Sequence, residues 1–306
     1  VQSMVSPTQV AVANPGTCTD CKTKDCIVGN DHSRGCQTAL FQPQKVGNLD
    51  CTYCFDGVEA CPHDNVALVQ VQPLADIAAD QRRSGIGRYT ERHDVAALIV
   101  LLFFAALVNA AWMTGPVIDL EDTVVARLGI GRLPVLTTGM LITLIALPLA
   151  IVWVVAYLSR RGANDEVPIK QNIASYAPAL VPLGLGMWLS HYSFHLFTTG
   201  DTVIVAARRA LGDLFGTGYS VAPTVCNCCS PTMISWLLPL ELIFLDIGLC
   251  ASLVVAYRIA QRLHDTNPAI YRSVAPWAML MVCFFALCVW VLLQPMQMRG
   301  AYMAGM

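Results

Sequence analysis

Charged residues are scarce in this sequence. Asp, Glu, Lys and Arg make up 13% of its 306 residues, hydrophobic residues make up 55%, and the mean hydropathy is +0.54. An ordinary soluble domain carries about 25% charged residues, so lipid is the expected surrounding for much of the chain. The net charge of −2 offers no basic surface, and nucleic acid is excluded as an expected partner.

The motifs of a self-contained enzyme are also missing. No phosphate-binding loop, nicotinamide fingerprint or activated nucleophile is evident. Substrate chemistry is therefore expected to belong to partner subunits. The first residues, VQSMVSPTQVAVANPGTC, lack a basic region followed by an apolar one, so they do not resemble a signal peptide.

Long apolar runs are abundant after residue 93. Five of them are long enough to be transmembrane helices, because about 20 helical residues, rising about 1.5 Å each, cross about 30 Å of hydrocarbon. They lie at about 95–117, 133–158, 173–197, 232–257 and 274–293. Four prolines are expected to bend these helices: Pro148, Pro178, Pro182 and Pro239. The predicted fold is an all-α membrane bundle of about five helices, preceded by a small cysteine-rich domain.

The basic residues beside these runs predict an orientation. Ten Lys and Arg residues flank one side: Arg82, Arg83, Arg88, Arg92, Arg160, Arg161, Lys170, Arg258, Arg262 and Arg272. Five flank the other: Arg127, Arg132, Arg208, Arg209 and Arg299. By the positive-inside rule the N-terminal domain is expected on the cytoplasmic side of the membrane. The predicted organisation is an N-terminal domain at 1–80, a basic linker at 81–93 and a membrane domain at 94–306. The membrane domain is expected to include an outer loop at 198–231, in which residues 202–215 form an interfacial helix.

The cysteines of the first domain carry the strongest chemical signal. Cys51, Cys54, Gly57, Cys61 and Pro62 match the ferredoxin run C-x₂-C-x₂-C-x₃-C-P except at the third cysteine, which is glycine here. A second group, Cys18, Cys21, Cys26 and Cys36, precedes this run. Such density in a cytoplasmic segment argues against disulfides and favours iron–sulfur clusters, with structural zinc or incidental thiols as the alternatives.

In a ferredoxin run the fourth cysteine ligates the other cluster. This rule predicts one [4Fe–4S] cluster on Cys18, Cys21, Cys26 and Cys61, and a second site on Cys36, Cys51 and Cys54. The second site lacks a thiolate because Gly57 occupies the slot. Three possibilities follow: a [3Fe–4S] cluster, a [4Fe–4S] cluster with another ligand such as Asp56, or no second cluster.

The segment from Cys18 to Leu68 resembles the NapH-like membrane ferredoxins, and most closely the FesM-type membrane polyferredoxins. The resemblance implies a ferredoxin-type double-cluster domain beside transmembrane helices. It also implies electron transfer between a cytoplasmic carrier and the membrane quinone pool or partner respiratory subunits. Gly57 departs from the cysteine that the family carries at this position.

Four ionisable residues lie inside the apolar runs. His191 and His195 are four residues apart and share a helix face, and Glu241 and Asp246 lie near the middle of the fourth run. Ionisable groups in membrane helices usually have a function, so metal ligation, quinone binding or a proton path is expected, with polar contacts inside the bundle as the plain alternative. A haem with two histidine ligands is not expected, because two residues on one face of one helix cannot occupy opposite axial positions.

Cys226, Cys228 and Cys229 cluster in the predicted outer loop, where thiols oxidise or bind copper. They suggest a second hypothesis, an assembly or metal-handling factor that reduces copper or disulfides outside the membrane. A third hypothesis is a sensing or structural protein whose cluster does not turn over. Cys250, Cys283 and Cys288 lie in apolar helices and are expected to be core residues.

Overall fold

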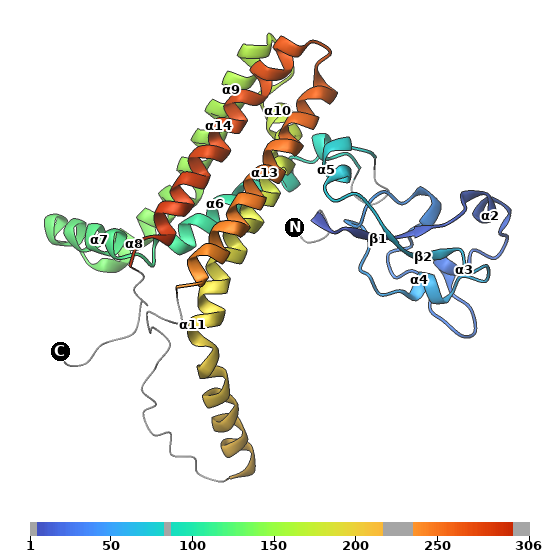
Figure 1. The fold of residues 1–306 in the computed structure, drawn as a ribbon, viewed down its shortest axis with the longest axis horizontal. Coiled ribbons are helices and arrows are strands. Elements are labelled where there is room, and N and C mark those ends of the chain that lie inside the picture. The colour runs from blue at the N-terminus through green and yellow to red at the C-terminus, as the bar shows by residue number, and fades with distance from the viewer. Residues whose placement is uncertain (1–4, 83–86, 217–234, 296–306) are drawn as a thin grey trace. The chain divides into compact units, whose positions relative to one another are not determined.

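The computed structural model describes residues 5–82, 87–216 and 235–295, and these are mostly helical (Figure 1). The chain forms two compact units. Within the described ranges, the first comprises the residues up to Leu102 together with Leu147–Pro182 and Ala251–Met281, and the second comprises Phe103–Ala146, Leu183–Cys250 and the residues from Val282.

The N-terminal part of the first unit has little regular structure. Strands β1 (Thr8–Val12) and β2 (Val66–Gln70) pair antiparallel, with Val10 opposite Leu68, into a two-stranded sheet. Four short helices lie in the same described part, namely α2 (Pro15–Asp20), α3 (Asp25–Val28), α4 (Asp56–Glu59) and α5 (Ala75–Ala79), with 3₁₀ turns at Gln42–Gln44 and Tyr89–Glu91. Its core consists of Val10, Val66 and Cys26, so a thiol occupies the place of a core side chain.

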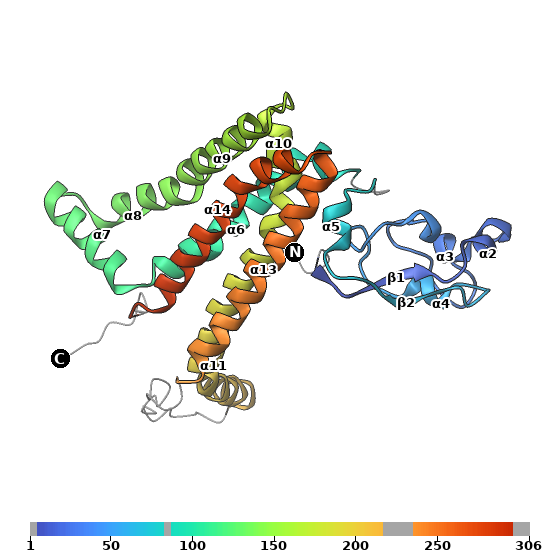
Figure 2. The ribbon, with the colours of Figure 1, turned by 45° about the horizontal axis from the view of Figure 1, so that its top comes forward.

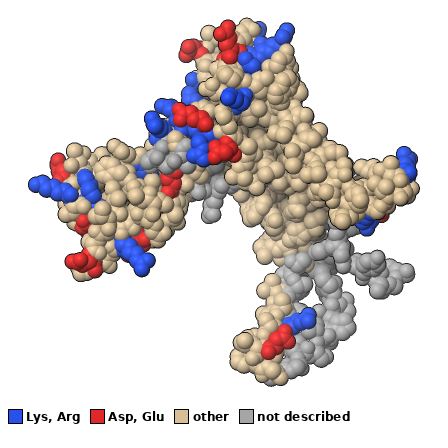
Figure 3. All heavy atoms as spheres, turned by 180° about the vertical axis from the view of Figure 1, so that it is seen from behind, with Lys and Arg blue, Asp and Glu red and all other residues tan. Residues whose placement is uncertain are grey.

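The five predicted spans are confirmed as helices long and apolar enough to cross a membrane. They extend over His93–Ala111, Arg132–Ala163, Ile169–Thr198, Leu237–Leu263 and Asn267–Leu292. The surface visible in Figure 3 has wide areas free of charged side chains. Large hydrophobic side chains of these helices, among them Leu101, Ile247 and Leu287, are exposed. This surface suits contact with lipid.

These spans are built from the helices α6 (His93–Ala111), α8 (Arg132–Leu141), α9 (Leu147–Ala163), α10 (Ile169–Tyr176), α11 (Val181–Phe215), α13 (Leu237–Leu263) and α14 (Asn267–Leu292). A shorter helix, α7 (Gly115–Leu128), separates the first two spans. Prolines mark the changes of helix type, because proline lacks the N–H that an α-helix interior needs. A π-helical turn (Ile142–Ala146) precedes Pro148, and a 3₁₀ turn (Ala177–Leu180) contains Pro178. Pro239 lies in the first turn of α13, where that N–H is not needed.

The predicted interfacial segment 202–215 is helical, but the prediction of a separate helix is wrong. It continues α11 without a break from Val181 to Phe215. At about 1.5 Å per residue, such a helix is about 52 Å long, well beyond about 30 Å of hydrocarbon. Its last turns therefore extend beyond a bilayer that the first turns span.

A buried polar network joins three helices of the first unit. Trp277 Nε1 donates to Asn172 Oδ1 at 3.2 Å, and Asn172 Nδ2 donates to Ser159 Oγ at 3.3 Å. The Ser159 hydroxyl donates to the Ser273 carbonyl at 2.8 Å, and Tyr176 Oη lies 2.7 Å from Ser273 Oγ. Because all five residues are buried and paired, the network fixes how α9, α10 and α14 pack.

In the second unit α11 and α13 pack closely side by side (Figures 1 and 2). Ser190 Oγ donates to the carbonyl of Glu241 at 2.8 Å. One turn earlier, a Cβ added to Gly186 would lie 2.6 Å from the Phe244 carbonyl oxygen and 3.6 Å from Gly248 Cα. Small residues therefore set the distance between these two helices, as is common in membrane bundles.

Candidate functional site

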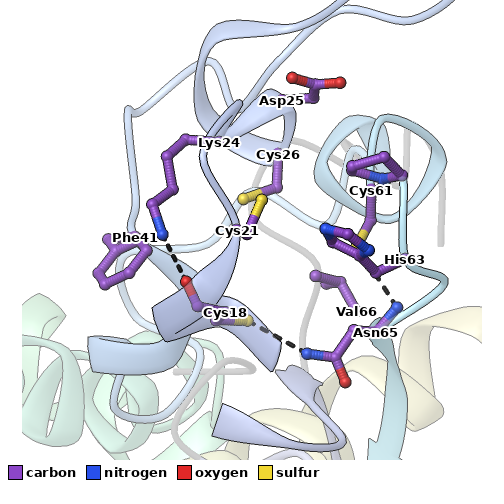
Figure 4. Close-up of a pocket in the computed structure, with 11 residues that line it drawn as sticks. Cys18, Cys21, Lys24, Asp25, Cys26, Phe41, Cys61, His63, Asn65 and Val66 are labelled. Carbon is purple, nitrogen blue, oxygen red and sulfur yellow. Dashed lines mark hydrogen bonds between the residues drawn. The ribbon is translucent and has the colours of Figure 1, made fainter. Parts of the chain in front are cut away.

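Four cysteines from two separate stretches of the chain line one pocket in the N-terminal part (Figure 4). They are Cys18 on α2, Cys21 at its C-terminus, Cys26 on α3 and Cys61 after α4. Local sequence signals place them: the Asn14 side chain caps α2 by accepting from Gly16 N–H at 2.9 Å, and Pro15 begins that helix. These are the four cysteines that the ferredoxin pattern groups into one cluster.

Left-handed backbone conformations surround the cysteines. Lys24 lies between Cys21 and Cys26 with φ 56°, Asp64 follows Cys61 with φ 48°, and Tyr53 and Phe55 on either side of Cys54 have φ 57° and 64°. A non-glycine residue in this region costs about 1–2 kcal/mol. Such strain persists where the surroundings determine the conformation, as in loops shaped to hold a ligand.

The four thiols would repel one another if they were ionised with no cation bound between them. Burial, followed by the charges of Cys61, Cys18 and Cys21, raises the pKa of Cys26. A hydrogen bond from the Lys24 backbone, followed by contacts of Thr23 and His63, lowers the pKa of Cys21 to about 7. A cationic group in the pocket would remove the mutual repulsion of the thiolates.

Hydrogen bonds to sulfur come from a residue that the sequence did not single out. Asn65 Nδ2 donates to Cys18 Sγ at 3.2 Å, and the Asn65 backbone N–H donates to Cys61 Sγ at 3.4 Å (Figure 4). Asn65 is itself held by Asn14, whose N–H donates to Asn65 Oδ1 at 2.9 Å. Lys24 Nζ donates to the Cys18 carbonyl and lies over the Phe41 ring. Asn65 thus contacts one thiol from each of the two stretches.

The other three cysteines do not line this pocket. Cys51 packs against the core around Val10, and Cys54 is exposed. Burial acts to raise the pKa of Cys36, but hydrogen bonds from Thr38 and Leu40 outweigh it and lower that pKa. Burial lowers the pKa of Lys45, whereas the negative charges of Cys51, Asp76, Asp50 and Cys36 act to raise it. The charge of this buried lysine is therefore influenced by carboxylates as well as by two of the three thiols.

Gly57 occupies a confined position. A Cβ there would lie 3.3 Å from the Cys26 carbonyl oxygen and 3.5 Å from Gln42 Nε2. Gln42 is 4% exposed, and its Oε1 is buried with no hydrogen-bond partner in the described ranges. Asp56, the alternative ligand suggested by the sequence, accepts a hydrogen bond from Gln37 Nε2 at 3.2 Å. The slot of the missing cysteine thus adjoins the amide nitrogen of a buried glutamine.

The four ionisable residues of the membrane helices are only partly brought together. His191 and His195 face each other on α11, with 3.2 Å between their Nε2 atoms. Glu241 on α13 is buried at the level of Ser190, whereas Asp246 is exposed on another face of α13. Asp246 therefore does not share the position of Glu241 inside the bundle.

Two further expectations concern the remaining cysteines. Cys288 is fully buried, as predicted for a core residue, but Cys250 and Cys283 are exposed, so the prediction was wrong for those two. They lie on the outward faces of α13 and α14, where a small apolar thiol tolerates lipid. Cys226, Cys228 and Cys229 lie outside the described residues.

Within the ranges that the structure describes, no three Cys, His, Asp or Glu side chains are arranged to hold a single metal ion. Comparisons with protein-family models, with curated proteins and with solved structures found no match.

Proposed function

We propose that this protein is a membrane-bound electron-transfer component that carries an iron–sulfur cluster in its N-terminal part, in the manner of the NapH-like and FesM-type membrane ferredoxins. The observation that carries the proposal is the pocket lined by Cys18, Cys21, Cys26 and Cys61, in a chain with five helices long and apolar enough to cross a membrane. Four thiols around one pocket are the donor set of a [4Fe–4S] cluster.

Two properties of the pocket's surroundings support a resident metal group. The N-terminal part has a small hydrophobic core in which Cys26 takes part, and domains of this size usually depend on a metal or disulfides for stability. Left-handed residues beside the cysteines add strain that a bound group would offset. Both favour a cluster that is part of the fold.

A cluster bound here supplies a carrier for one electron at a time. Residues of the chain around the cluster would set its reduction potential. Asn65 donates hydrogen bonds to Cys18 and Cys61, and the Lys24 ammonium lies beside Cys18. Donors and positive charge near the sulfurs stabilise the more negative, reduced state, so both residues raise the reduction potential.

The second site, on Cys36, Cys51 and Cys54, is proposed to hold a [3Fe–4S] cluster or a [4Fe–4S] cluster with a ligand other than cysteine. The Cys51 and Cys36 charges act to raise the pKa of the buried Lys45, so its positive charge interacts favourably with these thiolates. Electrons would then pass between a cytoplasmic carrier and the quinone pool or a partner subunit, with the N-terminal part on the cytoplasmic side of a bacterial inner membrane.

Anaerobic purification in detergent, followed by iron and sulfide counting and EPR, tests this proposal. We expect acid-labile sulfide, a reduced [4Fe–4S] signal, and reoxidation of the reduced protein by a water-soluble quinone analogue. Zinc in place of iron, or clusters with no accessible redox couple, would refute electron transfer.

Replacing Gly57 by cysteine is expected to change the second cluster. The new thiol completes the ferredoxin run, and its Cβ needs a shift of only a few tenths of an ångström against the Cys26 carbonyl. The oxidised-state EPR signal of a [3Fe–4S] cluster should decrease and iron should rise by about one atom per chain. Gly57→Ala, which adds the same Cβ without a thiol, is the matched control and should leave the cluster type unchanged.

A further inference from the structure

The histidine pair of α11 has a geometry that the proposed electron transfer does not use. His191 is 1% exposed, His195 is half-buried, and their Nε2 atoms are 3.2 Å apart. The two rings are nearly perpendicular, at 89°, and their Nε2 atoms are hydrogen-bonded to each other. Both nitrogens can therefore approach one ligand.

A distance of 3.2 Å suits two nitrogens bound to one metal ion. Metal–nitrogen bonds of about 2.0–2.1 Å that span this distance enclose an angle of about 100–105°, close to the tetrahedral angle. Imidazole is a good ligand for zinc and copper. The pair is thus already arranged as two neighbouring corners of a tetrahedral site.

Glu241 on the neighbouring helix α13 is the candidate partner for the other nitrogen of His191. His191 Nδ1 and Glu241 Oε1 are both buried with no hydrogen-bond partner among the described residues. Glu241 is 3% exposed, and its backbone carbonyl accepts from Ser190, the neighbour of His191 in sequence. A histidine bound to metal through Nε2 usually donates its Nδ1–H to a carboxylate.

The direction of the Glu241 side chain fits this role. Side chains on a helix lean toward its N-terminus. Because α11 and α13 are antiparallel, with Ser190 beside Glu241 and Gly186 beside Phe244, this lean carries the carboxylate away from Gly186 and toward the level of His191 and His195. Its negative charge would also offset the charge of a cation in a membrane helix.

We propose that His191 and His195 bind one tetrahedral transition-metal ion of the zinc or copper(I) class. Glu241 acts as the carboxylate that orients His191, and the remaining metal positions are open to water or another small donor. This site is independent of the cysteine pocket and of the proposed electron transfer.

X-ray absorption on the full-length, cluster-loaded protein in detergent tests the site, after incubation with Zn²⁺ or, in a parallel sample, with Cu⁺ and removal of excess metal. We expect one ion per chain with nitrogen ligands at about 2.0–2.1 Å, which distinguishes it from thiolate-bound metal at about 2.3 Å. The better-retained ion identifies the metal.

Three variants assign the ligands. His195→Ala, at a half-buried position that tolerates truncation, should lose the nitrogen-bound ion, and Glu241→Gln should weaken its affinity about 10–100-fold. Asp246→Asn, the matched exposed carboxylate on the same helix, should leave it unchanged. Wild-type protein without a nitrogen-bound ion, or His195→Ala with an unchanged absorption spectrum, would overturn the proposal. Cluster EPR on the same samples reports separately on the cysteine pocket.

Discussion

Replacing Cys26 by serine is expected to abolish the [4Fe–4S] signal and to remove about four iron atoms per chain, the content of one cubane. Cys26 is 9% exposed, lines the pocket with Cys18, Cys21 and Cys61, and belongs to the core around Val10 and Val66. A serine hydroxyl is a poorer iron ligand than thiolate. Iron analysis and EPR on reduced protein measure the loss.

The same substitution should also destabilise the N-terminal part, because the cluster and the core share this residue. Limited proteolysis is expected to cleave within residues 5–80 of Cys26→Ser while the helices stay intact. Cys283→Ser, at an exposed position on α14, is the matched control and should retain full iron content. Full iron content in Cys26→Ser would contradict the ligand assignment.

Replacing Gly186 by leucine is expected to lower the free energy of unfolding by about 3 kcal/mol, the upper part of the usual cost of overpacking. The first added carbon alone would lie 2.6 Å from the Phe244 carbonyl oxygen, so α11 and α13 must separate. The separation would also break the hydrogen bond from Ser190 to Glu241. Unfolding by SDS titration in mixed micelles, followed by circular dichroism, measures the change.

Gly131→Leu is the control for that substitution. Among the described residues, the only atom within 4 Å of a Cβ added at Gly131 is Pro134 Cδ, at 3.8 Å, so little has to move. We expect its unfolding curve to match that of the wild type within about 0.5 kcal/mol. Equal curves for Gly186→Leu and the wild type would mean that the close approach of α11 and α13 contributes nothing to stability.

The membrane helices could be predicted from sequence because the signal is long and local. About 20 apolar residues without charge fit few other structures, and each of the five predicted runs overlaps a long helix over most of its length. The ends of the helices were harder to predict. Residues 202–215 have an amphipathic pattern that suits an interfacial helix, and Gly200 before them is a residue type that often ends a helix, but α11 continues through both.

Glu241 and Asp246 were both expected to belong to a membrane site, but the helical period separates them. Five residues at about 100° each place the two carboxylates about 140° apart, on different faces. Sequence spacing was thus sufficient to separate them. Which of the two is buried, however, depends on α11, whose Ser190 contacts the Glu241 backbone 51 residues away in the chain.

The residues that contact the thiols, in contrast, could not be predicted from the spacing of the sequence. Spacing and residue type alone were sufficient to group Cys18, Cys21 and Cys26 with Cys61. Asn65 reaches Cys18 across 47 residues, and Gln42 meets Gly57 through a turn with no recognisable motif. Contacts of this kind depend on tertiary folding. The one available signal was the position of polar residues such as Lys24 and Asn65 within four residues of a cysteine.

The contact between α5 and later helices has a consequence for the order in which the molecule is built. Ile77 and Ala78 on α5 are buried, α5 packs against the 3₁₀ turn Ala177–Leu180, and Arg262 Nη1 donates to the Ala78 carbonyl at 2.6 Å across 184 residues. Synthesis proceeds from the N-terminus, so α5 emerges long before Arg262. The cysteine-bearing part therefore waits, incompletely packed, until the fourth span has been made. If the cysteines bind the proposed cluster during that interval, its loading and the insertion of the helices into the bilayer would be linked in time.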